Sequence, residues 1–449
     1  MTNPRPKKSI LNRLAASPWP APLLITLASL AILGARLPSE PHFIDESAYY
    51  SQSYFFSLFL NGDRHSALWL EYPAADLRPI PKYMIALAIQ SAGYPLTHRD
   101  DAWAWYGETS TRFEPPGALT AARIPFVVVG ALGCLAIYGL GALASGKSIG
   151  AIAALLLAVN PLYRLHSRRA MSDVPCEAFM LLALFFILYA WKRILEARLN
   201  PATWLLAISA GLAAALSVLS KLSGLLTLLT MTAWAILALV VPVPFTRKFA
   251  LIPATLLAAA AFALACLALD PFLTAHSTRT LSSPQSKLNN KSFLERLKLL
   301  KDQRLIVSMG QQNVFKHNAV TTPLAKIAVV AIQGFGRFGP LGPPHSDSTR
   351  RFDPAQDWGL LLWTPLVAAG ALLTWRNGRS QLTQNLPPAS WAILLHFTIA
   401  LVVVTAYIPM AWDRYLLPIQ APASLLAASA IVALGTRLLA PSTTHESTP

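Results

Sequence analysis

The chain has 449 residues, of which 54% are apolar and only 13% are charged, and its formal net charge is +16. Together with a mean hydropathy of +0.46, this composition excludes soluble globular and disordered proteins and indicates a polytopic membrane protein. The three cysteines, Cys134, Cys176 and Cys266, lie in or beside apolar stretches without metal or disulfide spacing. They are therefore expected to be small core residues.

A helix needs about 20 apolar residues to cross the hydrocarbon core. Ten stretches come close to this length, although the third is short: 19–37, 121–143, 148–163, 174–191, 203–219, 223–243, 249–269, 358–375, 390–409 and 415–437. Two further apolar stretches, 79–96 and 323–335, are short and interrupted by Lys or Gln. We expect those two to be interfacial or partly buried helices rather than spans.

Basic residues in short loops predict the orientation by the positive-inside rule. The N-terminus contains Arg5, Lys7, Lys8 and Arg13, and is predicted to be cytoplasmic. With ten spans, the same side carries the other short basic segments, and the C-terminus also lies inside: Lys147, Lys192, Arg193, Arg198, Arg247, Lys248, Arg376, Arg379 and Arg437.

Two long segments, 38–120 and 271–356, then lie outside the cell. The second is basic, which long translocated loops tolerate. We therefore expect four regions: a catalytic membrane module over 1–270 that includes the external loop 38–120, a basic external region over 271–356, C-terminal membrane helices over 357–440, and a disordered tail over 441–449.

The adjacent acids Asp45 and Glu46 directly follow the first span, where charge is costly unless it has a task. Residues 46–60 are predicted to form a helix with Asp45 at its N-cap and Asn61-Gly62 at its end. A second helix is expected to start after Arg78 and to end near Tyr94.

Several short motifs, in this order and spacing, resemble the GT-C membrane glycosyltransferases, and most closely their protein O-mannosyltransferase and aminoarabinose transferase group. They are FIDESAYY at 43–50, RPIPKY at 78–83, ARIP at 122–125, the stretch 160–173, SKLSG at 220–224 and DRYLLP at 413–418. The resemblance covers most of residues 20–435 and implies an all-helical GT-C fold.

The resemblance further implies transfer of a sugar from a polyprenyl-phosphate donor, outside the cell and with inversion, to a hydroxyl of a protein, lipid or glycan. It assigns the general base to Asp45 and a second acid to Asp173, with Glu46 as a helper. Inversion requires such a base, and the departing phosphate needs cations. The candidate phosphate ligands are Arg78, Lys82, Arg168, Arg169, Lys221 and Arg414.

The sequence leaves the need for a metal open. Some relatives carry a Glu just before the position of Arg78, where this chain has Asp76 and Leu77. If a divalent ion is bound, Asp45 and Asp173 are its expected ligands. No other cofactor is indicated, and the expected partners are the donor, its acceptor and membrane lipids, with no nucleic acid.

Simpler interpretations exist for six of these residues. Asp45 and Asp173 would be ordinary helix caps, Arg168 and Arg169 a cytoplasmic basic loop, Lys221 a snorkelling lysine, and Arg414 an interface anchor. Two other functions also remain: a polyprenyl-glycan ligase or polymerase of another fold, and a transporter or flippase of lipid-linked sugars. A transporter is expected to show paired repeats and mid-membrane charges, and we find neither in the sequence.

Overall fold

A computed structural model describes residues 20–96, 115–242, 244–277, 289–337 and 359–439. Over these ranges the chain is helical, and its one β-type pairing is an isolated bridge between Ala319 and Met410. The basic N-terminus, the basic residues of 338–356 and the tail predicted to be disordered lie outside the described residues.

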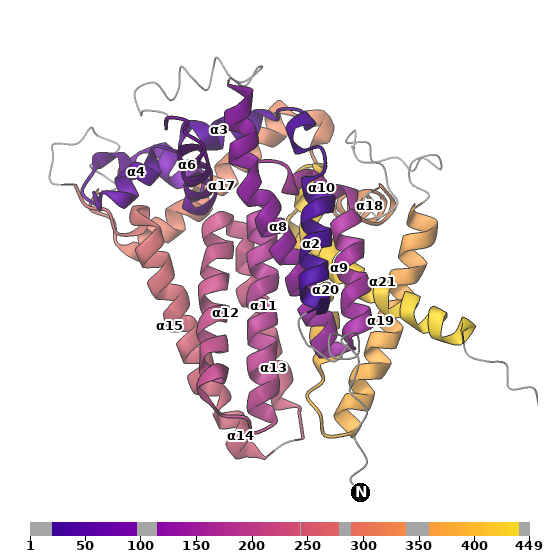
Figure 1. The fold of residues 1–449 in the computed structure, drawn as a ribbon. Coiled ribbons are helices and arrows are strands. Elements are labelled where there is room, and N and C mark those ends of the chain that lie inside the picture. The colour runs from indigo at the N-terminus through magenta and orange to yellow at the C-terminus, as the bar shows by residue number, and fades with distance from the viewer. Residues whose placement is uncertain (1–19, 97–114, 243, 278–288, 338–358, 440–449) are drawn as a thin grey trace, which may run out of the picture.

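The membrane part is a bundle of long apolar helices (Figure 1). Among the described residues, nine segments are long and apolar enough to cross a membrane, and a bent pair of helices would make ten. The prediction of an all-helical protein with about ten spans is confirmed. The helices are α2 (Pro20–Gly34), α8 (Pro116–Ala144), α11 (Asp173–Leu195), α12 (Pro201–Ser220), α13 (Leu225–Leu239), α15 (Leu251–Leu269), α19 (Gly359–Thr383), α20 (Ala389–Tyr407) and α21 (Leu417–Leu438).

The bent pair is α9 (Lys147–Val159) followed by α10 (Pro161–Ser167), whose axes differ by 66°. Pro161 has no N–H to continue the α9 ladder, so the helix breaks there. The Asn160 side chain caps the new helix by accepting from the N–H groups of Leu162 and Tyr163, both at 3.0 Å. It also donates to Gln420 at 3.0 Å, which fixes the bend against α21.

Helix α8 is longer than the membrane requires. Its 29 residues extend about 43 Å, whereas the hydrocarbon core is about 30 Å thick. Its first turns therefore rise above the ends of α11 and α12 (Figure 1). Tyr49 and Ile85 of the cap described below pack on this projecting part, against Leu119 and Phe126.

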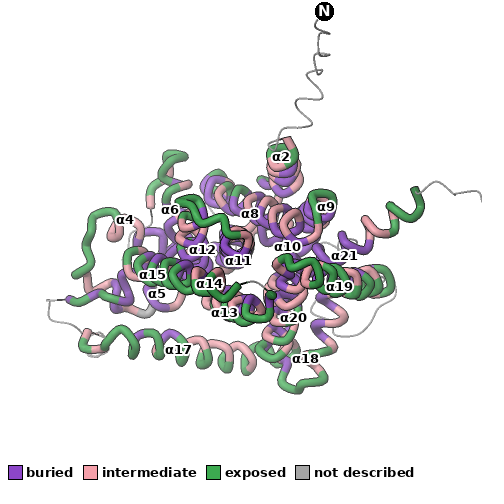
Figure 2. Tube along the Cα trace, turned by 90° about the horizontal axis from the view of Figure 1, so that it is seen from below, coloured by how far each residue is buried: buried purple, intermediate pink, exposed green. Residues whose placement is uncertain are grey.

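The helices at this end, called the cap here, come from both external segments. They are α3 (Ile44–Ser51), α4 (Phe55–Leu60), η2 (Ala67–Leu70), α5 (Tyr72–Asp76), α6 (Pro79–Ser91), α17 (Phe293–Val314), α18 (Pro323–Val329) and the π-helix η6 (Val330–Arg337). Helix α17 runs along one side of the bundle when it is viewed down the helices (Figure 2). Neither α6 nor α18 reaches spanning length, as expected for 79–96 and 323–335.

Three predicted helix boundaries were wrong. The single helix over 46–60 is two helices, α3 and α4, with a break between Ser51 and Phe55, and Phe43 rather than Asp45 is the N-cap of α3. Glu46 causes this earlier start because its carboxylate accepts from the Phe43 N–H at 3.0 Å. Asn61 does end α4, as predicted, whereas α6 ends at Ser91, before the expected Tyr94.

The cap packs on the bundle through a second apolar cluster. Ile80 and Tyr83 of α6 pack there with Leu219 of α12, Cys266 of α15 and Phe272. The cap lies at one end of the bundle, and the short helix α14 (Phe245–Phe249) and the start of α2 lie at the other (Figure 1). The structure thus separates the predicted external segments from the short basic turn that contains Arg247.

Replacing Asn160 with Ala is expected to lower the free energy of unfolding by about 2 to 4 kcal/mol, because it removes a helix cap and leaves the buried Gln420 without its donor. Thermal denaturation in detergent measures this loss. Asn160→Ser can keep the cap but not reach Gln420, so its loss should be about half as large. Equal losses for the two variants would mean that the cap contributes nothing.

Candidate active site

The carboxylate of Glu46 is fully buried and accepts four hydrogen bonds. Arg123 of α8 donates from Nε to Oε1 at 2.8 Å and from Nη2 to Oε2 at 2.6 Å. The backbone N–H of Phe43 donates to Oε2 at 3.0 Å, and that of Ala170 donates to Oε1 at 2.8 Å. Every lone-pair direction of this carboxylate thus has a donor, and Glu46 has no oxygen left for a substrate.

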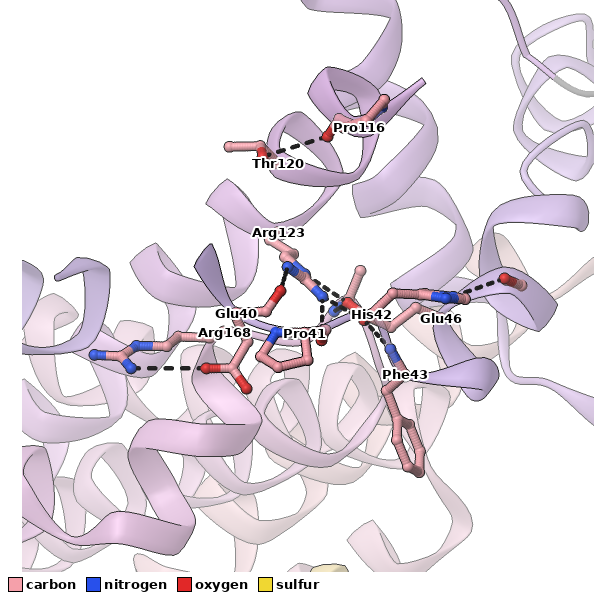
Figure 3. Close-up of polar contacts among 11 residues, drawn as sticks. Glu40, Pro41, His42, Phe43, Glu46, Pro116, Thr120, Arg123 and Arg168 are labelled. Atoms are coloured by element: carbon pink, nitrogen blue, oxygen red, sulfur yellow. Dashed lines mark hydrogen bonds and ion pairs between the residues drawn. The ribbon is translucent and has the colours of Figure 1, made fainter. Parts of the chain in front are cut away.

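The guanidinium of Arg123 also donates further hydrogen bonds, to backbone carbonyls. Its Nη1 donates to the Glu40 carbonyl at 2.8 Å, and its Nη2 also donates to the Pro41 carbonyl at 2.9 Å. Figure 3 shows the guanidinium reaching from α8 between residues 40–41 and Glu46. Through this one pair, α8, the start of the cap and the turn before α11 are held in a fixed arrangement. This arrangement determines the positions of both Asp45 and Asp173.

Asp45, next to Glu46, points away from this anchor and forms an ion pair with Arg414. Arg414 lies in the short helix η7 (Asp413–Leu416) at the start of the last span, and its guanidinium is 4.6 Å from the ring centroid of Trp412. The Asp45 side chain is 35% exposed, in contrast to Glu46. Asp45 is therefore the acid of the pair that an acceptor could reach.

Asp173 pairs with Lys221 at 2.6 Å. Its side chain is 2% exposed, whereas Lys221 is more open and its ammonium lies 5.5 Å from the ring centroid of Tyr415, the residue that follows Arg414. Ser172, not Asp173, is the N-cap of α11, and Asp173 is its first residue. Asp45, Arg414, Asp173 and Lys221 together form what we call the carboxylate–cation cluster.

Tyr49 borders the carboxylate–cation cluster, and sequence reasoning did not find it. Burial raises the pKa of Tyr49, and the charges of Asp173 and Asp45 raise it further, so its hydroxyl keeps its proton. Its position four residues after Asp45 places both on one face of α3, which is the signal that could have identified it. A neutral phenol here can donate a hydrogen bond to a substrate oxygen.

The predicted cations Arg78 and Lys82 belong to a second group of residues. Arg78 forms a buried ion pair with Asp270 at 2.5 Å, and Lys82 lies 4.6 Å from the ring centroid of Phe55. Burial lowers the pKa of Lys82 to about 7, against the opposing effect of the Asp270 and Asp76 charges. No local sequence signal marks Asp270, which was not among the candidates.

Arg168 and Arg169 have other contacts. Arg168 donates to the carbonyls of Leu33 at 2.9 Å and Ile32 at 3.3 Å, and lies 3.7 Å from the Glu40 carboxylate (Figure 3). It thereby satisfies carbonyls at the end of α2, a position that favours cations. Arg169 lies over the ring of Phe43, 4.3 Å from its centroid. Of the six predicted phosphate ligands, Lys221 and Arg414 thus lie in the carboxylate–cation cluster with Asp45 and Asp173.

The acids do not form a metal site in this arrangement. Asp45 and Asp173 are each already paired with a cation. In the part of the chain that the structure describes, no three His, Cys, Asp or Glu side chains lie close enough together to hold an ion. A divalent ion between Asp45 and Asp173 would first have to displace Arg414 and Lys221, so the residues present do not fit one.

Residues 116–268 match the model of a family described as dolichyl-phosphate-mannose-protein mannosyltransferase. This segment begins with α8 and ends within α15, and it contains Arg123, Asp173 and Lys221. A search of curated proteins gives no match.

The fold is similar to those of solved membrane glycosyltransferases. The oligosaccharyltransferase AglB from Archaeoglobus fulgidus, in complex with an inhibitory peptide and a dolichol-phosphate, matches with a TM-score of 0.53 and 15% identity, over 93% of this chain and 50% of that one. The same archaeon's enzyme in complex with Zn and sulfate matches with a TM-score of 0.54 and 17% identity, over 93% and 49%. ArnT from Cupriavidus metallidurans bound to undecaprenyl phosphate matches with a TM-score of 0.52 and 16% identity, over 92% and 60%.

These matches confirm the resemblance predicted from the sequence. The chain is an integral membrane protein with the fold of the GT-C glycosyltransferases. It spans about half the length of AglB and three fifths of that of ArnT. The alternative of a ligase or polymerase with a different fold does not agree with this architecture.

Replacing Arg123 with Met is expected to lower the free energy of unfolding by about 3 to 5 kcal/mol, because it leaves the buried Glu46 charge without its partner. The midpoint of thermal denaturation in detergent reports the loss. The double variant Glu46→Leu, Arg123→Met should recover part of it, since no unpaired charge remains.

Arg64→Met is the matched control for this experiment, because Arg64 is exposed and its guanidinium donates to the carbonyls of Leu267 and Ala268. It should cost less than about 1 kcal/mol. If Arg123→Met were no more damaging than this control, Glu46 would not be a buried charge.

Proposed function

We propose that the protein transfers a sugar from a polyprenyl-phosphate-linked donor to an acceptor hydroxyl on the extracytoplasmic side of the membrane, with inversion at the anomeric carbon. The observation that carries this proposal is the carboxylate–cation cluster, in which the half-exposed Asp45 faces Arg414 beside the Asp173–Lys221 pair. The AglB structure holds a dolichol-phosphate and the ArnT structure an undecaprenyl phosphate, which supports a lipid phosphate as the carrier.

In this proposal Asp45 is the general base. The acceptor O–H proton passes to the Asp45 carboxylate as the oxygen attacks the anomeric carbon. The bond from that carbon to the phosphate oxygen breaks, and its electrons remain on the phosphate, which becomes a monoester. Attack and departure occur on opposite faces of the sugar, so the configuration inverts. Asp45 then gives its proton to water, which its exposure allows.

The phosphate gains negative charge as it leaves, and cations that are already in place stabilise this charge most effectively. Arg414 and Lys221 are the cations of the cluster, and each is paired with an acid before the donor arrives. The phosphate therefore competes with Asp45 for Arg414. When the phosphate takes the arginine, the Asp45 carboxylate is released from this ion pair and can accept from the acceptor hydroxyl.

The other predicted acids receive supporting roles. Asp173 holds Lys221 near the phosphate position, and its own burial makes it a poor proton acceptor for a bulky substrate. Glu46 is a positioning residue that sets the direction of Asp45 through Arg123. Arg78 and Lys82, which belong to the second group of residues with Asp270, are assigned to the phosphate end of the donor. No step here depends on a metal.

Asp45→Asn should lower transfer by about 100-fold to 10,000-fold, the range that a general base contributes. It should leave undecaprenyl phosphate binding intact or tighter, because Arg414 loses its competitor. Release of undecaprenyl phosphate from a panel of undecaprenyl-phosphate-linked hexoses and pentoses measures transfer. Asp63→Asn, which changes an exposed acid in the same cap, is the control. Transfer at the wild-type rate by Asp45→Asn would show that Asp45 is not the general base.

Sidedness has its own test. The native cysteines are all buried, so a new exposed cysteine can be labelled selectively. Asp63→Cys, in the cap, should react with an impermeant maleimide added outside intact cells. Asn377→Cys, at the opposite end of the bundle beside Ser145, should react only after the membrane is opened. The reverse pattern would place the cap in the cytoplasm and contradict the proposal.

A further inference from the structure

The ion pair of Arg78 and Asp270 lies where the cap meets the membrane bundle. Arg78 is the N-cap of α6, and Asp270 is the residue that ends α15. The atoms Nη2 and Oδ2 are 2.5 Å apart, and the side chains are 4% and 2% exposed. Their chain neighbours on both parts, Ile80 of α6 and Cys266 of α15, belong to the buried apolar cluster between cap and bundle. The pair is therefore cut off from water.

Arg78 has too few acceptors for a buried guanidinium. Among the residues that the structure describes, its Nε and Nη1 are buried without a hydrogen-bond partner, and so is the hydroxyl of Tyr83 on α6. Buried polar groups are normally satisfied. The guanidinium of Arg78 thus has more donors than the carboxylate of Asp270 accepts from. This imbalance points to a ligand with several acceptor oxygens and negative charge.

A phosphate ester has these properties, and a guanidinium binds it through two parallel N–H groups. Asp270 already occupies Nη2 of Arg78. A phosphate that used both terminal nitrogens would have to replace the carboxylate there. Asp270 and a phosphate are therefore alternative partners of the same arginine.

Building on the proposed function, we propose that Asp270 is a positioning residue that competes with the carrier phosphate for Arg78. It holds the arginine while the donor site is empty, releases it to the phosphate, and takes it back when the product leaves. The class of ligand is a polyprenyl phosphate monoester, the product of transfer, which carries more charge than the diester donor.

The competition has a definite thermodynamic sign. Without an acidic partner, an empty site would leave Arg78 as an unpaired buried charge, which is strongly unfavourable. Asp270 removes this cost from the empty state and therefore weakens phosphate binding. A more highly charged product would otherwise remain bound to the cations. The carboxylate thus makes product release possible at the expense of affinity.

The test compares the full-length protein and its Asp270→Asn variant in nanodiscs, with undecaprenyl phosphate as the probe. The asparagine keeps an acceptor oxygen for Arg78 but removes the charge. We expect undecaprenyl phosphate to bind about tenfold more tightly, the effect of one charge-assisted contact. In steady-state transfer, KM and kcat should both fall, because product release becomes slower. Asp270→Glu should stay close to the wild type, as should the control Asp63→Asn.

Equal or weaker binding by a folded Asp270→Asn variant would overturn the role of Asp270 and leave the transferase proposal standing. No binding by the wild type or any variant would overturn both. Tighter binding without transfer from any donor would support Asp270 and contradict the transferase.

If Asp270→Asn does not fold, the double variant Arg78→Gln, Asp270→Asn removes both charges and avoids an unpaired one. It should bind undecaprenyl phosphate about tenfold more weakly than the wild type, because the contested arginine is gone. Wild-type affinity in this double variant would mean that the pair only fastens the cap to α15, and would overturn the proposal.

Discussion

The buried pair of Glu46 and Arg123 determines the geometry of everything above the membrane helices. A charge at this depth is tolerable only with a complete set of partners, and the four donors on Glu46 come from three separate parts of the chain. None of these parts can shift without exposing the Glu46 carboxylate or depriving it of a hydrogen-bond donor. The direction of Asp45 and the start of α11 at Asp173 follow from that one constraint.

A second regularity concerns the cations at the cap end of the bundle. Arg414, Lys221 and Arg78 are each paired with one acid: Asp45, Asp173 and Asp270. The pairs are spread over two groups of residues. In each pair the acid offsets the positive charge, so that the net charge in a low-dielectric environment is close to zero. In the proposed function, a lipid phosphate would enter by exchange of partners rather than by attraction to an unpaired positive surface. Such a site favours ligands with several oxygens over simple chloride or single carboxylates.

The sequence predicted the fold class, and it singled out Asp45 and Asp173 as candidate acids, because both leave local signals. Long apolar stretches define the spans, and Asp45 and Asp173 stand at span ends where charge is conspicuous. It did not predict which cation meets which acid. Arg414 lies 369 residues from Asp45, and Asp270 lies 192 residues from Arg78, so tertiary packing alone decides these contacts. The start of α3 after Phe43 was missed for a similar reason, since Glu46, which accepts from the Phe43 N–H, is held by Arg123 of a distant helix.

The length of α8 has a mechanical consequence. Because its first turns stand beyond the bundle and carry both the apolar contacts of the cap and Arg123, one continuous helix is shared by the two parts. The Glu46–Arg123 pair braces this helix beside Pro125, where one backbone hydrogen bond is missing. Cap and bundle should then move as a single body, without a hinge between them. Opening of the site would rest on rotations of side chains such as Arg414 and Lys221, which are fast compared with domain motions. In such a protein, the acceptor would bind to a preformed site, and its binding would not depend on opening of the cap.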